Sequence, residues 1–296
     1  MLTNEQTEFY RENGYLLIEG AIAPEPLAAM QRVTADLIER SRAVPESDDV
    51  YDLDEGHGPD TPRLTRIKLP HTRDAAYADV LHGPRLAALL EPLIGPNIRL
   101  HTSKLNTKAP GGGAAVEWHQ DWAFYPHTND DILAVGIMLE DVDEANGPLM
   151  VIPGSHRRPM LSHHRNGVFC GAIDPADPLF EPEKAVTITG KAGDMSIHHV
   201  RVLHGSAPNR SDRARKLLFF EMMAADAWPL MGVAGVYQGL SASEMWYRMK
   251  DNLVCGEQSS VPRLEAVPVS MPLPLPSDAS SIFKVQKSGG AISAFG

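Results

Sequence analysis

The chain has 296 residues, enough for one large β domain with added helices or for two small domains, and its 43% hydrophobic residues suffice for a sizeable core. Lys and Arg number 27 against 38 Asp and Glu, and the formal net charge of −11 argues against binding to nucleic acid or anionic membranes. No apolar segment reaches the roughly 18 residues of a membrane helix, and the N-terminus lacks a secretory pattern, so a cytoplasmic location is expected.

Residues 1–96 are expected to form helical support together with the first strands. Thr3 and Gln6 have the spacing of a capping box, and Gly14 is placed to end that helix in a left-handed conformation. The polar, acidic stretch 41–62 offers little to bury and is expected to be a mobile loop. The expected elements in chain order are a helix at 3–14, a strand at 15–18, a helix at 24–38, a strand at 63–69 and a helix at 84–94.

Residues 97–224 show a different pattern, with short β-like runs separated by Gly, Pro and Asn turn signals. Many short strands of this kind favour a sandwich or jelly roll over a parallel sheet. We therefore expect a mainly β fold with flanking helices around a jelly-roll core, all in one domain spanning 1–296. The expected strands are 98–105, 116–120, 132–139, 149–152, 185–188, 195–203 and 216–222.

Residues 225–296 are expected to form a C-terminal extension. It carries a helix near 241–251 and a Pro-rich segment over 261–276 that is expected to lie extended over the domain or to be partly disordered. The two cysteines, Cys170 and Cys255, lack the pairing of a disulfide framework or a zinc knuckle and are interpreted as ordinary thiols. The sequence carries no indication of the oligomeric state.

The most informative segment is Glu117-Trp-His-Gln-Asp-Trp122, in which His119 and Asp121 stand two residues apart. On a strand this spacing points both side chains to the same side. One imidazole and one carboxylate on a common face can bind a divalent metal such as Fe(II), Mn(II) or Zn(II). Because His-x-Asp occurs often by chance, a third ligand is needed before the pair predicts a metal site.

The third ligand is expected at His204, where an apolar strand ends in His204-Gly205-Ser206. Strands distant in sequence lie side by side in a jelly roll, so the separation from Asp121 is no obstacle. His198 and His199 compete for this position, but the Gly-Ser after His204 and the short step to an arginine favour His204. Two histidines and one carboxylate on one side of an iron leave the opposite positions open for a keto acid and O2.

Arg215 opens a run in which Arg215, Leu217 and Phe219 share one face if the run is a strand. An arginine among apolar inward residues needs an anion, and its planar guanidinium matches a carboxylate. The distal carboxylate of 2-oxoglutarate, assisted by the Ser206 hydroxyl, is the expected partner. A solvent-exposed Arg215 that merely ends the strand is the alternative.

These segments resemble the phytanoyl-CoA dioxygenase family of Fe(II)/2-oxoglutarate oxygenases. Within the block 118–222, His119-Gln-Asp121 resembles the first two iron ligands and His204-Gly-Ser206 resembles the distal ligand with its co-substrate serine. Arg215 falls at the family's arginine position, and Asn146-Gly-Pro-Leu-Met-Val-Ile-Pro-Gly-Ser-His156 resembles the family's loop and strand signature. The resemblance also covers 9–18 and 100–110, and the family fold is a double-stranded β-helix, the cupin-like form of the jelly roll.

The resemblance implies further site residues. Arg66 and Ser103 are expected to help bind 2-oxoglutarate. Gly136 stands where relatives often carry a tryptophan, so it is expected to enlarge the pocket or to accompany a different substrate. Trp122, Phe124 and Tyr125 are candidates for the substrate mouth, although aromatic residues beside a strand are core residues more often than contact surface.

The sequence thus predicts an Fe(II)- and 2-oxoglutarate-dependent dioxygenase that uses O2 to oxidise an unactivated C–H bond of a small or medium-sized metabolite, releasing succinate and CO2. Asp121 argues against halogenation, because a halide would need its coordination position. Only Arg157-Arg158 and His163-His164-Arg165 offer the basic patch that an acyl-CoA would want. Two alternatives stay open: a zinc or manganese hydrolase or isomerase on the same jelly roll, and a non-catalytic ligand-binding jelly roll.

Overall fold

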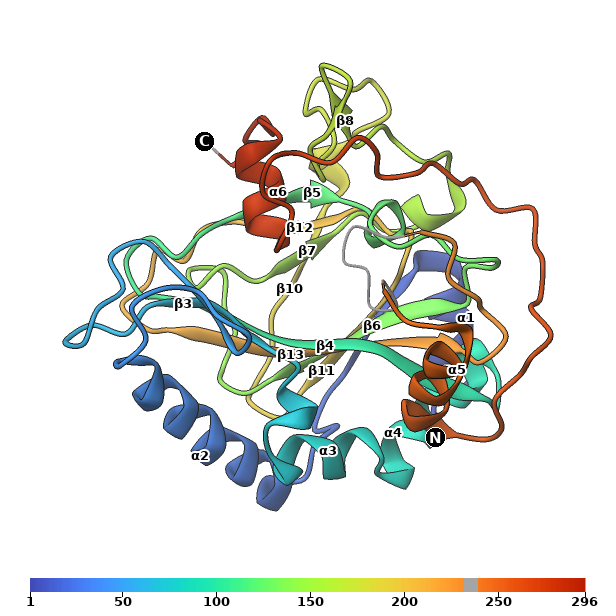
Figure 1. The fold of residues 1–296 in the computed structure, drawn as a ribbon, viewed down its shortest axis with the longest axis horizontal. Helices are drawn as coiled ribbons and strands as arrows, with labels where there is room; N and C mark the ends of the chain where they lie inside the picture. The colour runs from blue at the N-terminus through green and yellow to red at the C-terminus, as the bar shows by residue number, and fades with distance from the viewer. Residues whose placement is uncertain (232–238, 296) are drawn as a thin grey trace.

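Two antiparallel sheets face each other, and helices cover the outer side of the larger sheet (Figure 1). The computed structural model describes residues 1–231 and 239–295, so residues 232–238 and 296 of the expected C-terminal extension lie outside the described part. None of the described helices is long and apolar enough to cross a membrane.

The larger sheet has the strand order β1-β11-β6-β13-β4-β3-β2, with β14 also paired to β4. From β1 to β4, neighbouring strands come from segments far apart in sequence, as a double-stranded β-helix requires, whereas β4, β3 and β2 are consecutive along the chain. In sheet order they are β1 (Tyr15–Ile18), β11 (Met195–His199), β6 (Ile132–Met138), β13 (Arg215–Ala224), β4 (Ile98–Lys108), β3 (Leu64–Lys68) and β2 (Tyr51–Leu53), with β14 at Leu253–Cys255.

The smaller sheet has the order β10-β7-β12-β5, which leaves β5 at its edge. Its strands are β10 (Val186–Ile188), β7 (Leu149–Val151), β12 (His204–Ser206) and β5 (Val116–His119), and a separate hairpin pairs β8 (His164–Arg165) with β9 (Val168–Phe169). The expected jelly-roll class, mainly β with flanking helices, is confirmed.

The helices expected at 3–14, 24–38, 84–94 and near 241–251 are present, whereas the helix at Ala75–Leu81 was not expected. Thr3 and Gln6 form the expected capping box of α1, and Gly14 ends the helix at a φ of 76°. Gly14 is also required for space, since a Cβ there would lie 2.4 Å from His156 Nδ1. The helices are α1 (Asn4–Asn13), α2 (Pro24–Ser41), α3 (Ala75–Leu81), α4 (Pro84–Ile94), α5 (Ala242–Asp251) and α6 (Ile282–Ser288). Short 3-10 turns occur at Pro70–Thr72, Asp121–Ala123, Ser155–Arg157 and Pro182–Lys184.

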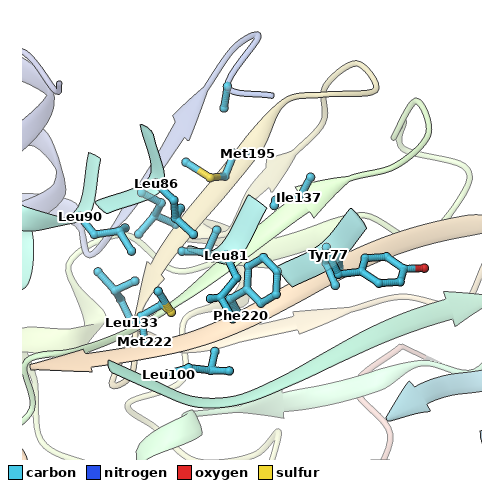
Figure 2. Close-up of a cluster of buried hydrophobic side chains, with 14 of the residues drawn as sticks. Tyr77, Leu81, Leu86, Leu90, Leu100, Leu133, Ile137, Met195, Phe220 and Met222 are labelled. Carbon is cyan, nitrogen blue, oxygen red and sulfur yellow. The ribbon is translucent and has the colours of Figure 1, made fainter. Parts of the chain in front are cut away.

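The main core lies between α3, α4 and the outer face of the larger sheet (Figure 2). Tyr77 and Leu81 come from α3, and Leu86 and Leu90 from α4. Each fully buried side chain of this size contributes roughly 1.5–3 kcal/mol to folding. The strand residues they meet include Leu100, Leu133, Ile137, Met195, Phe220 and Met222. This core fixes the larger sheet from outside and leaves its inner face free for polar side chains.

Three sequence expectations about local structure were wrong. The stretch 41–62 contains the strand β2, whose Tyr51 is buried and whose backbone pairs with β3. The expected strand 195–203 stops at His199, and the chain turns before starting β12 at His204. Asp121 opens a 3-10 turn just after β5, so it does not share a strand with His119. Helix α6 was not expected, whereas 261–276 contains neither helix nor strand and runs extended across the molecule (Figure 1).

Candidate active site

His119, Asp121 and His204 meet on the inner side of the smaller sheet. Strands β5 and β12 are antiparallel neighbours, and their register sets His204 directly opposite His119. The 3-10 turn that follows β5 then brings the Asp121 carboxylate back toward the two rings. One potential ligand atom from each residue lies within 4.8 Å of the others, and all three side chains are buried.

The two histidine rings present the same nitrogen to the site. His119 Nδ1 lies 2.8 Å from the Glu117 carbonyl oxygen, and His204 Nδ1 lies 3.0 Å from that of Val202. An Nδ1–H that donates to a carbonyl leaves the Nε2 lone pair free. Asp121 Oδ1 lies 3.4 Å from His119 Nε2 and 3.8 Å from His204 Nε2, so two nitrogens and one oxygen converge.

The protonation states also suit a cation. Burial, reinforced by His119 and His198, holds the pKa of His204 well below its usual value, so its imidazole is neutral. Burial raises the pKa of Asp121, but His204, His119 and His198 outweigh this effect and hold the pKa well below its usual value. A buried carboxylate beside a neutral imidazole supplies donors that a divalent metal accepts.

The rival histidines have different surroundings. His199 turns away from the site and lies 5.1 Å from the His156 ring, with its Nδ1 accepting the Arg201 N–H at 3.1 Å. His198 does face the site, but its Nε2 is 3.6 Å from Asp121 Oδ2, on the carboxylate oxygen away from His119 and His204. Neither residue belongs to the set of three converging ligand atoms.

A first cavity extends from the three ligand residues to a pair of buried cations, Arg215 and Lys108. Lys108 Nζ donates to the Ser206 hydroxyl at 2.8 Å and to the Ser206 carbonyl at 3.1 Å. In the described part of the chain, no carboxylate forms an ion pair with either cation, and Arg215 Nε is buried without a hydrogen-bond partner. This end of the cavity therefore has the charge and the donors for an anion.

Burial alone lowers the pKa of Arg215 to about 9, which leaves the guanidinium charged at neutral pH. Burial and the neighbouring Arg215 hold the pKa of Lys108 well below its usual value. An anion bound between them would favour the charged form of both. Lys108 was missed by the sequence prediction, although Lys104, Asn106 and Lys108 continue a period of two along β4 and all three line this cavity.

Arg215, Leu217 and Phe219 line the first cavity together, as their alternation on β13 predicts. Phe219 occupies the space directly beside Gly136, where an enlarged pocket was one of the two expectations. A Cβ on Gly136 would lie 2.9 Å from Phe219 Cε1 and 2.7 Å from Ser196 Oγ. Glycine at this position therefore makes room for the Phe219 ring.

A second cavity of about 260 Å³ adjoins the first at Asp121, Lys104 and Ile282. Lys104 pairs with the buried Glu221. Burial opposes a charge on Lys104, but Glu221 and Asp121 outweigh it and raise the pKa. Burial and the carboxylates of Asp121 and Glu221 raise the pKa of Tyr125 well above its usual value, so its hydroxyl stays a donor.

The structure places four of the five remaining predicted residues around this second cavity. Arg66 lines it while pairing with Asp52 at 2.6 Å and donating to the Ser280 carbonyl at 2.9 Å. Ser103 also lines it, and its Oγ lies 2.6 Å from His71 Nδ1. Phe124 and Tyr125 are wall residues as well. Trp122 is buried elsewhere, with its indole N–H donating to the Pro268 carbonyl at 2.6 Å.

Comparison with known proteins agrees with this geometry. The sequence profile described as Phytanoyl-CoA dioxygenase (PhyH) matches residues 10–217. A protein of Stutzerimonas stutzeri named "Probable alpha-ketoglutarate-dependent hypophosphite dioxygenase" is 36% identical over 289 residues, covering 96% of each chain. An "Ectoine dioxygenase" of Bordetella parapertussis is 28% identical over 241 residues, covering 74% of each chain.

Solved structures show the same fold. EctD from S. alaskensis, crystallised with 2-oxoglutarate and 5-hydroxyectoine, superposes with a TM-score of 0.63 at 25% identity, covering 76% of this chain and 77% of that one. Most of the present chain is matched by the family profile, and nearly its full length by one relative above 30% identity. The chain belongs to the phytanoyl-CoA dioxygenase family and is an Fe(II)- and 2-oxoglutarate-dependent oxygenase.

Proposed function

We propose that His119, Asp121 and His204 bind the catalytic Fe(II) and that the first cavity holds 2-oxoglutarate. The observation that carries this assignment is that one cavity joins the three converging ligand atoms to two buried cations, neither of which pairs with a carboxylate of the described residues. A keto acid has a chelating end for the metal and a distal carboxylate for Arg215, Lys108 and Ser206. The membership of the family favours oxidation over the hydrolase and binding-protein alternatives.

The residues of the chain have separate tasks in this proposal. Iron with bound keto acid supplies the power to transfer oxygen from O2 to an unactivated bond, with release of succinate and CO2. The Glu117 and Val202 carbonyls orient the two histidine rings, and Asp121 contributes the negative charge that offsets the metal. The apolar side chains Leu217 and Phe219 exclude water from the first cavity.

The second cavity is proposed to bind a small, polar substrate, because its wall combines donors with the carboxylates of Asp121 and Glu221. Lys104, Tyr125 and Arg66 offer an ammonium, a hydroxyl and a guanidinium around a space of about 260 Å³. The Stutzerimonas relative, similar over almost its full length, is named for hypophosphite. Small oxyanions are therefore the first compounds to test, with P–H oxidation beside the C–H oxidation expected from sequence.

An acyl-CoA substrate is disfavoured, because the arginines that could form its basic patch already have partners. The expected basic patch at Arg157-Arg158 is partly neutralised, because Arg158 pairs with Glu181. Arg165, the other candidate, donates to the Gly290 carbonyl. We also propose that 1–296 acts as a single domain, since β1 to β3 complete the larger sheet and Ile282, far beyond it in sequence, lines both cavities.

Anaerobic addition of Fe(II) and then 2-oxoglutarate to metal-free protein tests the proposal. We expect a weak visible absorption from the iron and keto acid chelate and, after admission of O2, succinate formation that a true substrate accelerates. The substrate panel should include hypophosphite, small phosphonates and ectoine. Absence of both the absorption and the succinate, together with zinc- or manganese-dependent hydrolysis, would replace the oxygenase assignment with the hydrolase alternative.

A further inference from the structure

The C-terminal helix α6 covers the site although it lies far outside the 10–217 family match. It sits beside β5, the strand that carries His119 (Figure 1). Ile282 lines both cavities, Phe283 the first and Val285 the second. Helix α6 is therefore a wall shared by the co-substrate and substrate spaces.

Gln286 attaches this helix to β5 through the backbone of Glu117. Its Oε1 accepts the Glu117 N–H at 3.0 Å, and its Nε2 donates to the Glu117 carbonyl at 3.3 Å and to the Gly171 carbonyl at 3.0 Å. Gln286 is only 6% exposed. Because β5 is the edge of the smaller sheet, the amide occupies a peptide position that a neighbouring strand would otherwise take.

The Glu117 carbonyl connects α6 to the proposed iron site. The oxygen that accepts from Gln286 also lies 2.8 Å from His119 Nδ1. This single carbonyl fixes which nitrogen of His119 carries the proton and where Nε2 points. Movement of the Glu117 peptide would therefore turn the first proposed ligand.

The chain around α6 is built for close docking. Val285 is fully buried against Phe124 and Phe169. Gly171 has a φ of 62°, and a Cβ there would lie 2.8 Å from Val285 Cγ1 and 2.7 Å from Phe124 Cζ. Further along, the Ala294 N–H donates to the Glu117 carboxylate at 2.8 Å. The docked position of α6 is thus specified on both sides of Gln286.

We propose that Gln286 is a positioning residue that completes the iron site by fixing the Glu117 peptide and, through it, His119. The inference rests on the proposed function, in which His119 binds the metal. It makes docking of α6 and occupancy of the iron site mutually dependent. By thermodynamic reciprocity, whatever α6 docking adds to metal affinity, the metal adds to the stability of the docked helix.

The substitution Gln286→Met removes all three hydrogen bonds at similar volume, and Lys287→Met on the exposed side of the same helix is the matched control. Partners that orient metal ligands change metal affinity by about 10- to 100-fold. We expect Q286M to weaken Fe(II) binding about tenfold in anaerobic titrations with 2-oxoglutarate, read from the chelate absorption. K287M should titrate like the wild type.

Hydrogen exchange of the wild-type protein gives a second measurement that needs no variant. Amides of 282–290 should exchange about tenfold more slowly once Fe(II) and 2-oxoglutarate are bound. Wild-type Fe(II) affinity in Q286M would overturn the role of Gln286. Exchange rates in 282–290 that stay the same when Fe(II) and 2-oxoglutarate bind would overturn it as well. Failure of the wild-type protein to form the chelate at all would instead reject the proposed iron site itself.

Discussion

At the residue scale, the proposed ligand set depends on which histidine faces Asp121. We expect His204→Ala to abolish the chelate absorption and substrate turnover, because one of three ligands is lost. His199→Ala should leave Fe(II) binding intact and lower the stability instead, since His199 packs near the rings of Tyr10 and His156. Anaerobic Fe(II) titration and thermal unfolding of both variants separate the two effects. Intact Fe(II) binding in H204A would move the third ligand to another residue.

The two buried cations at the far end of the first cavity carry a second prediction. Arg215→Met should raise the KM for 2-oxoglutarate about 100-fold, which corresponds to about 2.7 kcal/mol, the range of a buried charge-assisted pair. Lys108→Met should raise it about tenfold, because the lysine shares its protons with Ser206 and the Ala207 carbonyl.

Lys216→Met is the matched control for both variants. Lys216 lies next to Arg215 on β13 but outside the first cavity, and it pairs with Glu140. Initial rates of succinate release at varied 2-oxoglutarate measure the three KM values. Equal KM values for R215M and K216M would remove the distal carboxylate from this end of the cavity.

The sequence predicted which residues form the site better than it predicted their backbone conformation. His119, Asp121 and His204 were singled out by spacing and resemblance, yet the same-strand argument for the first two was wrong. A 3-10 turn brings Asp121 to the site, and nothing in His-Gln-Asp distinguishes it from a continued strand. Lys108 was missed because a buried lysine without an acidic partner makes sense only once a bound anion is considered.

At the element scale, β2 and β3 are joined by one buried carboxylate. Asp52 is 1% exposed and pairs with Arg66 at 2.6 Å and with Lys68 at 2.9 Å. We expect Asp52→Ala to lower the free energy of unfolding by about 3 kcal/mol, because two neighbouring cations lose their only acidic partner in the described chain. Urea unfolding followed by circular dichroism measures the change.

The control for this variant is Asp36→Ala, which breaks an exposed pair with Arg40 on α2. Exposed pairs of this kind contribute about 0.5 kcal/mol. A loss in D52A no larger than that in D36A would mean that β2 is held by its backbone pairing alone.

The pairing of Asp52 with the cations of β3 also explains why 41–62 was wrongly expected to be a mobile loop. Composition indicated a polar loop, but Asp52 is polar because it binds cations from the next strand, and Tyr51 packs into the core. Helix α6 was missed for a related reason. It has only seven residues, and its position comes from contacts with β5 that are distant in sequence. Strongly periodic helices such as α2 and α4 needed no such contacts and were predicted.

At the scale of the whole molecule, the number and spacing of short strands were enough to predict a jelly roll. Which strands neighbour each other was not readable from spacing, because the order β10-β7-β12-β5 is set by how the two sheets close around the site. The same closure buries many histidines. Burial lowers the pKa of His127 and of His163 to about 3, and that of His71 to about 4.

These neutral histidines make the folded protein sensitive to acid. Each has a folded pKa below the unfolded value of about 6.5, so the unfolded chain binds more protons between those two values. Stability therefore falls as the pH drops below about 6.5, by about 1.4 kcal/mol per pH unit for each such histidine, and these groups have no effect above that pH. The loss is complete only below about pH 3 to 4.

A substitution at His127 isolates one of these contributions. His127 is fully buried and its Nδ1 lies 2.7 Å from the Tyr125 carbonyl oxygen, a contact that the amide of His127→Asn can keep. We expect H127N to be less stable than the wild type at pH 8. Between pH 6 and 4.5 the free energy of unfolding of both proteins falls, but the slope for H127N is smaller than the wild-type slope by about 1.4 kcal/mol per pH unit. Urea unfolding of metal-free protein across this range measures both slopes. Parallel curves for H127N and the wild type would show that His127 takes up its proton without unfolding.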